Sequence, residues 1–202
     1  MESAEQVSHI EDTYKAIGRF VVEFSTLLAS LDGGTLRLIG GIRAIGNPLL
    51  MALLADRTAL PIVSSFFAVF GECWKDRMKS EEKRLISLLR KELQELVEER
   101  NRLMHDVWMT QYVEGEPGPY DMARVRNRAS KEGMEYEISD FGPNRLNGLT
   151  DDAIRLAEVV SGLAHYCGDD STPLNLTSKI VEDGKKVRWI GRLDDLGVRR
   201  SI

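Results

Sequence analysis

The clearest hydrophobic pattern in the chain lies between residues 80 and 108, where leucine or valine recurs every three or four positions. With about 100° of rotation per residue, these positions fall in one arc, which predicts a long amphipathic helix with one buried face. Ser80, Glu81 and Glu82 mark its start, because serine can cap a helix and the helix dipole favours acidic residues in the first turn. The apolar positions are Leu85, Leu89, Leu93, Leu96, Leu103 and Val107.

Four further segments have helical spacing. Residues 9–31 form the first, and Asp32-Gly33-Gly34 is expected to stop or bend it. A short helix over 49–55 follows, then an almost wholly apolar one over 58–73, expected in the core or at a dimer seam. The last helix begins at Thr150, which is expected to cap it, and ends near Gly168.

After Trp108 the period changes from helical to two. Residues 107–113, 121–128 and 134–140 predict three short antiparallel strands, and a hairpin is predicted around Asp183-Gly184. The fold class is therefore mainly α, a helical bundle with a small antiparallel β insertion at about 107–141. One helical domain over 1–171 and a C-terminal tail over 172–202, with the hairpin packed on the domain, account for the length.

Composition narrows the class of protein. The net charge is −5, so the surface as a whole does not suit nucleic acid, and any phosphate contact must come from a local patch. The two cysteines have no metal-ligand spacing, and reduced thiols in the cytoplasm are expected. The longest apolar run, residues 59–70, is shorter than the roughly 20 residues that cross a bilayer, so no membrane association is expected.

Arg100 interrupts the apolar arc of the long helix. A guanidinium stays charged, so it needs an anion, a partner or a wet cleft. Asn101 and His105, four residues apart, share the neighbouring flank and form a polar cluster with Arg100 at the helix end. Two interpretations are open: the cluster is a site, or Arg100 pairs with an acid such as Glu23 of the first helix.

The cluster, as a site, suits metal-free cleavage of RNA. The 2′-hydroxyl is a built-in nucleophile, so the protein needs a base, an acid and a cation for the charge on phosphorus. Histidine titrates near neutrality, and arginine has a fork that fits phosphoryl oxygens. Nothing beside the cluster has metal-ligand spacing, so neither a metal nor a cofactor is expected. One candidate histidine per chain favours a two-fold dimer that brings two copies of His105 together.

The run Arg100-Asn101-x3-His105, written RNRLMH in this sequence, resembles the signature of the HEPN superfamily. The resemblance implies a helical homodimer with ribonuclease activity in the cleft between the two motif helices. Arg100 would bind the phosphate, His105 would act as general acid and base, and Asn101 would orient the histidine or the substrate. In the branch paired with nucleotidyltransferase antitoxins a tyrosine follows two places after the histidine, where this chain has Val107.

Arg124, Arg126 and Arg128 alternate onto one face of the second predicted strand. They are candidate substrate-binding residues, a basic ridge for an RNA backbone beside His105. The favoured alternative is a charge ladder, in which Glu135 and Glu137 of the next strand neutralise them. Another small basic cluster surrounds Trp189 in the tail, where nucleic-acid contact and docking of the tryptophan on the domain are both open.

These patterns predict a metal-independent endoribonuclease of the HEPN type, in the role of a toxin or defence effector. Its expected partners are RNA, a second copy of the chain, and an antitoxin or regulatory protein. The alternatives are a catalytically inactive HEPN-like dimer that binds a nucleotide or a partner protein, which the negative net charge favours, and a helical protein whose Arg100 is simply ion-paired.

Overall fold

The computed structural model describes residues 4–44, 47–105, 107–109, 123–130, 133–140, 142–168 and 175–191. The chain is mainly helical with small antiparallel sheets, as the sequence predicts. In chain order the elements are α1 (Ala4–Gly40), η1 (Gly41–Ala44), α2 (Pro48–Leu54), α3 (Ala59–Trp74), α4 (Ser80–His105), β1 (Val107–Met109), β2 (Ala123–Ser130), β3 (Gly133–Asp140), α5 (Pro143–Cys167), η2 (Leu176–Ser178), β4 (Ile180–Asp183) and β5 (Lys186–Trp189).

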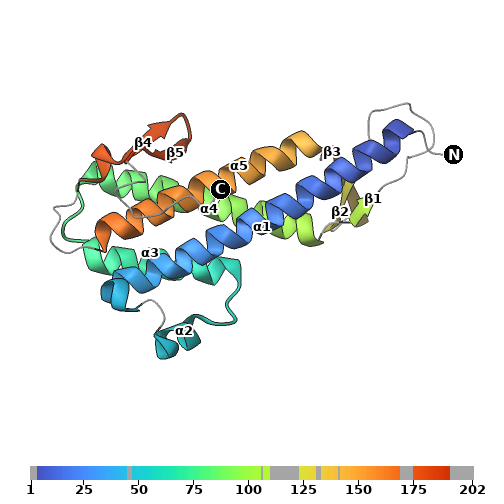
Figure 1. Cartoon of the computed structure of the whole chain (residues 1–202). Coiled ribbons are helices and arrows are strands. Elements are labelled where there is room, and N and C mark those ends of the chain that lie inside the picture. Colours follow the sequence, from blue (N-terminus) through green and yellow to red (C-terminus); the bar gives the residue numbers. More distant parts are fainter. Residues whose placement is uncertain are drawn as a thin grey trace.

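The four long helices form an elongated bundle (Figure 1). Helix α1 packs along α5 in the most extensive contact between described elements, and α3 covers only the C-terminal part of α1. Helix α4 runs in the opposite direction to the other three, and α2 stands to one side with no buried residue. The core between the helices is aromatic and aliphatic, and its members include Phe20, Phe24, Leu27, Phe66, Phe70, Leu89, Leu93, Leu156 and Val160.

Of the two outcomes expected at Asp32-Gly33-Gly34, a stop or a bend, the stop is wrong, because α1 continues to Gly40. A Cβ on Gly34 would lie 2.9 Å from the ring of Phe66 and 3.1 Å from the Cβ of Ala164. Gly34 therefore lets α1 approach α3 and α5 closely, a packing role that local sequence cannot distinguish from a helix end.

The last long helix begins earlier than predicted. Helix α5 starts at Pro143 rather than at Thr150, because proline fits the first helical position and Leu146 and Leu149 extend the apolar spacing backwards. Thr150 is buried inside the helix and donates its hydroxyl to the carbonyl of Leu146 at 2.9 Å, so it caps nothing. Gly168 follows the helix end, as predicted.

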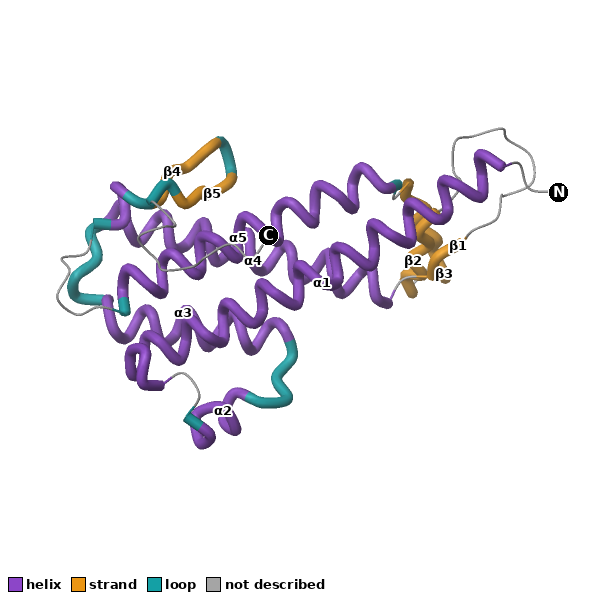
Figure 2. The backbone as a smooth tube through the Cα atoms, viewed as in Figure 1, coloured by secondary structure: helices purple, strands orange, loops and turns teal. Residues whose placement is uncertain are grey.

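The strands form two separate antiparallel groups (Figure 2). Strands β1, β2 and β3 pair in sequence order after α4, at the predicted place, and α4 ends at His105 instead of continuing to residue 108. Strands β4 and β5 form the predicted C-terminal hairpin, with Gly184 at φ +67° in its turn. Trp189 of β5 packs on α5, where a Cβ on Gly162 would lie 2.4 Å from its ring, so the docked-tail interpretation of this tryptophan is correct.

None of the helices in the described part of the chain combines the length and the apolar character that crossing a membrane requires.

The adjacent glycines of α1 give a matched test of this packing. Gly34→Ala should lower the free energy of unfolding by about 1–3 kcal/mol, because the new methyl group must displace Phe66 or Ala164. Gly33→Ala should raise it by roughly 0.5–1 kcal/mol, because a Cβ there meets no atom within 4 Å and alanine favours the helix. Urea unfolding of both variants measures the change in the free energy of unfolding. Equal changes in the two variants would contradict the close approach at Gly34.

Candidate functional site

The predicted cluster occupies the last two turns of α4. Asn101 and His105 are exposed and Arg100 is half-buried, while Leu103 between them is buried in the core. Helix α4 is the only long helix that runs toward this end of the bundle, and the three-stranded sheet follows it directly (Figure 1). The cluster is therefore held by a helix that is anchored in the core and is open to solvent.

Arg100 lies over an aromatic ring and forms no ion pair with Glu23, so that sequence interpretation is wrong. Its guanidinium carbon is 5.9 Å from the centroid of Phe24 in α1, and its Nη1 donates to Oδ1 of Asn101 at 3.2 Å. Phe24 itself is buried in the core. A cation over an aromatic face keeps its charge, so Arg100 remains able to attract an anion.

His105 is separate from Arg100 within one chain. Five residues along a helix correspond to about 140° of rotation and roughly 7.5 Å of rise, whereas Asn101 and His105, four residues apart, share a face. Among the described residues, Arg100 and Asn101 share a hydrogen bond, and neither forms one with His105. A single chain thus brings two of the three predicted site residues together.

The second predicted set, Arg124, Arg126 and Arg128, lies on β2, and its side chains are outside the described residues. The backbone register places Arg126 opposite Glu137 and Arg128 opposite Glu135. This opposed backbone register is the one that the charge-ladder interpretation requires.

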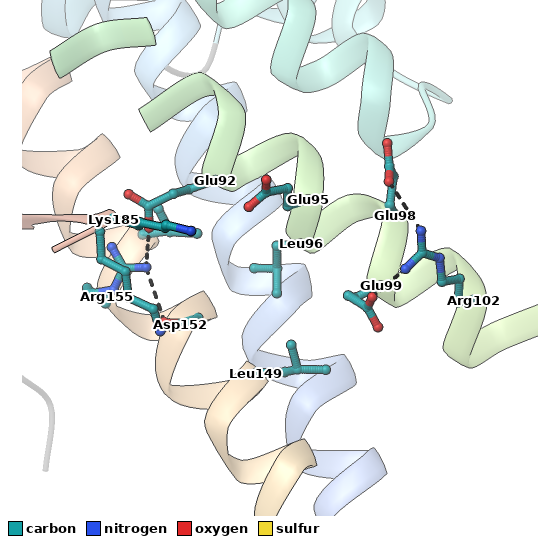
Figure 3. A pocket seen from close by; sticks show the side chains of 12 residues that line it. Glu92, Glu95, Leu96, Glu98, Glu99, Arg102, Leu149, Asp152, Arg155 and Lys185 are labelled. Carbon is teal, nitrogen blue, oxygen red and sulfur yellow. Dashed lines mark hydrogen bonds and ion pairs between the residues drawn. The ribbon is translucent and has the colours of Figure 1, made fainter. Parts of the chain in front are cut away.

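A pocket of about 510 Å³ lies between α4, α5 and the C-terminal hairpin, and the three residues of the cluster do not line it (Figure 3). Leu96 and Leu149 lie between two groups of charged side chains. The complete lining is Glu92, Glu95, Leu96, Glu98, Glu99, Arg102, Leu149, Asp152, Arg155, Leu156, Lys185 and Lys186. Carboxylates outnumber cations in this lining, so the pocket does not suit a phosphate.

Most charges around this pocket are paired within the chain. Arg155 reaches Glu92 at 2.5 Å and Asp152 at 3.1 Å, and Arg102 reaches Glu99 at 2.6 Å. Arg100 differs from both, because no carboxylate of the described residues lies within ion-pair distance of it. Among the cations of α4 and α5 near this end of the molecule, Arg100 is the one that is available for an external anion.

Two buried glutamates of α4 hold the C-terminal segment, a role that the sequence reasoning missed. Glu82, 1% exposed, accepts the backbone N–H of Lys79 at 2.8 Å and that of Leu176 at 3.0 Å. Glu92, 9% exposed, accepts the N–H of Val187 at 2.6 Å. Their signal was available, because both glutamates fall on or beside the apolar arc that contains Arg100.

In the described part of the chain, no group of three or more His, Cys, Asp or Glu side chains could hold a metal ion. Comparisons with protein-family models, with curated proteins and with solved structures found no match to this chain. The resemblance to the HEPN superfamily therefore depends on the RNRLMH motif and its place at the end of α4.

The buried Glu92 predicts a pH dependence. Burial raises the pKa of Glu92 above that of an exposed glutamate, although Arg155 and the N–H of Val187 act in the opposite direction. Between the unfolded and the raised folded pKa the folded protein retains a proton that the unfolded chain has released. The free energy of unfolding attributable to Glu92 should therefore fall as the pH rises through this window.

Glu182 should give the opposite dependence of stability on pH. Its exposed carboxylate is hydrogen-bonded to Arg84, which lowers its pKa. The measurement is the free energy of unfolding of wild type, Glu92→Gln and Glu182→Gln between pH 3.5 and 7. As the pH rises, wild type should lose stability relative to Glu92→Gln. Over the same range it should gain stability relative to Glu182→Gln. Parallel curves for the two variants would contradict these environments.

Proposed function

We propose that this protein is a metal-independent endoribonuclease of the HEPN type that acts at the ends of two α4 helices in a homodimer. The main support is the availability of Arg100, whose guanidinium lies over Phe24 and is not neutralised by a carboxylate of the described residues. Asn101 is exposed beside it, and His105 is exposed one turn further along α4 on the face of Asn101. A role as a toxin or defence effector, with an antitoxin or regulatory protein as a further partner, is part of the same proposal.

The proposed reaction uses the substrate's own nucleophile. His105 of one chain removes the proton from a 2′-hydroxyl, the O2′–P bond forms, and the bond from phosphorus to the 5′-oxygen breaks. A second histidine protonates the departing 5′-oxygen, which leaves a cyclic phosphate and a free 5′-hydroxyl. Arg100 stabilises the charge that gathers on the phosphoryl oxygens, and Asn101 holds the guanidinium in place through the 3.2 Å hydrogen bond.

Two chains are needed because one chain supplies one imidazole at this place, about 140° around the helix from Arg100. A two-fold axis near the ends of α4 supplies the second imidazole and allows Arg100 of one chain to act with His105 of the other. The arginines of β2, opposed by Glu135 and Glu137 in the register, then make a smaller contribution to RNA binding than a free basic ridge would.

Binding of a nucleotide or a partner protein without cleavage is the second candidate. The carboxylates of Glu98 and Glu99, which directly precede Arg100 in the sequence, favour it because they repel an RNA backbone. A nucleotide site would share the contact between Arg100 and phosphate with the nuclease, whereas a site for a partner protein would not, so a steep fall of RNA affinity with rising salt argues against the partner-protein form. The nuclease and the nucleotide site differ in whether bound RNA is cut.

The histidine gives the direct test of cleavage. His105→Ala should lower the rate of RNA cleavage by at least about 100-fold, because it removes the proton-transfer group. The exposed side chain has no packing role to lose, so thermal unfolding should not change. Gel analysis of a mixed-sequence RNA in the presence of EDTA measures the activity, and cleavage that persists in this variant would remove His105 from the mechanism.

The arginine has a matched control within the same helix. Arg100→Ala should lower cleavage by about 100-fold through loss of transition-state stabilisation. Arg90 also lies over a phenylalanine, with its guanidinium carbon 6.0 Å from the centroid of Phe67, so Arg90→Ala removes the same kind of cation–π contact two to three turns away from the cluster. Equal losses of activity in both variants would show that Arg100 acts through stability instead of phosphate binding.

A further inference from the structure

Helix α2 is an apolar helix that the rest of the chain does not cover. Its seven residues, PLLMALL, include no polar side chain, and none of them is buried. Leu49 is 70% exposed, Met51 is 51% exposed and Leu53 is 68% exposed. Figure 1 shows the helix standing apart from the four long helices, below α3 and away from the β4–β5 hairpin. Packing within the chain therefore does not account for the apolar character of α2.

Polar contacts fix both ends of α2. At its start, the side chain of Asn47 accepts two backbone N–H groups of the first turn, at 3.0 and 3.4 Å. At its end, Nε of Arg57 donates to the carbonyl of Leu54 at 3.1 Å, and the same guanidinium is ion-paired with Asp32 of α1. These contacts stabilise the helix and connect it to α1, so its apolar side chains are presented on a defined element.

The exposed apolar surface extends beyond α2. Ten large hydrophobic side chains are exposed among the described residues, and five of them lie between residues 39 and 60. Besides the three in α2, these are Ile39 at the end of α1 and Leu60 in the first turn of α3. Single exposed apolar side chains are ordinary, whereas a concentration around one short helix indicates an interaction surface.

The width of the apolar face favours lipid over a groove in a protein. A helix that binds in a groove buries a stripe of about 100° and keeps a polar face for solvent. Helix α2 has no polar face, and its exposed positions span roughly 200° of its circumference at about 100° per residue. A groove would leave part of this surface in water, whereas the acyl region of a bilayer surrounds all of it. The exposed positions are Pro48, Leu49, Met51, Ala52 and Leu53.

The small size of the surface also favours lipid. A helix of seven residues is about 10 Å long. Even together with Ile39 and Leu60 it offers far fewer than the roughly 20–30 residues that each partner contributes to a standard protein–protein interface. A segment at a membrane surface needs no such area, because its apolar side chains enter the boundary between headgroups and acyl chains directly.

The charge of this part of the chain suits an anionic surface. The whole protein has a net charge of −5, but residues 33–71 contain three arginines, one aspartate and no other charged residue. Arg57 is already paired with Asp32, which leaves Arg37 and Arg43, shortly before α2, to attract anionic headgroups. A short apolar segment binds a membrane stably when such an electrostatic attraction is added to it.

We propose that α2 anchors this protein to the surface of a bilayer that contains anionic phospholipids, with Leu49, Met51 and Leu53 inserted into one leaflet. A helix about 10 Å long lies in the interface and does not cross the roughly 30 Å hydrocarbon core. The sequence expectation of no membrane association came from the length that a crossing helix needs, a criterion that does not apply to a surface helix. The inference goes beyond the proposed nuclease function and does not depend on it.

Flotation of the full chain with vesicles tests the anchor. Wild type should float with vesicles of phosphatidylcholine mixed with phosphatidylglycerol. Leu49→Glu and Leu53→Glu should each lower the affinity for these vesicles by about tenfold or more, because each places a carboxylate in the acyl region. Both positions are exposed, so thermal stability should not fall. Val22→Glu, the same kind of change at a position of α1 that is 62% exposed, is the matched control and should bind as wild type does.

Two results of this experiment would overturn the anchor. One is a wild type that does not float with the mixed vesicles, and the other is an affinity of the two α2 variants equal to that of wild type. Vesicles of phosphatidylcholine alone should bind more weakly, and rising salt should weaken binding to the mixed vesicles through screening. Equal affinity for neutral and anionic vesicles would contradict the assignment to an anionic surface.

A tryptophan in α2 distinguishes insertion into lipid from contact with protein. The fluorescence of Leu53→Trp should be quenched by lipids brominated in their acyl chains to a greater extent than that of wild type, whose own three tryptophans give the background. Sedimentation of Leu49→Glu without vesicles should give the wild-type mass. Quenching equal to wild type would overturn the insertion, and a lower mass would assign α2 to a contact between copies instead.

The anchor and the nuclease proposal fail separately. Leu49→Glu should cleave RNA in solution as wild type does, because α2 contributes no residue to the proposed site. His105→Ala should bind vesicles as wild type does, because the histidine lies on α4. Vesicle binding by a protein that does not cleave RNA would contradict the nuclease function and support the anchor.

Discussion

The close approach of α1 to α3 and α5 at Gly34 is the constraint on which the rest of the structure depends. Phe66 and Ala164 both lie in the space that a side chain at this position would need. The contact fixes the position of α3 along α1, so that the N-terminal half of α1 extends beyond the start of α3 (Figure 1). At the uncovered end only α1, α4 and α5 remain of the four long helices, and there Arg100 lies over Phe24.

Helix α4 uses its charged residues in two different ways because its surroundings change along its length. Where the C-terminal segment covers it, Glu82 and Glu92 are buried and accept backbone N–H groups, so these carboxylates act as structural acceptors. Beyond that cover, Arg100 takes the equivalent inward position with an aromatic ring below it and solvent beside it. The same arc of α4 thus carries buried structural carboxylates at Glu82 and Glu92 and an accessible cation at Arg100.

The sequence predicted most elements of the fold but not the places where tertiary packing overrides local preference. Helical spacing located α3 and α4, and turn residues located the hairpin at Gly184. The glycine pair Gly33-Gly34 gave a wrong helix end, because the space available to a Cβ depends on α3 and α5, which are distant in sequence. For the same reason the sequence could show that Arg100 needs a partner but could not show that Phe24 would take the place of Glu23.

The accessibility of the proposed site has a physical origin in the unequal lengths of the helices. Helix α1 extends beyond the start of α3, so the end of α4 that lies along the N-terminal half of α1 is not covered by α3 (Figure 1). In α4 this produces an unneutralised guanidinium and a lone exposed imidazole. A second copy of the chain at this end of α4 would supply the second imidazole that the proposed chemistry requires.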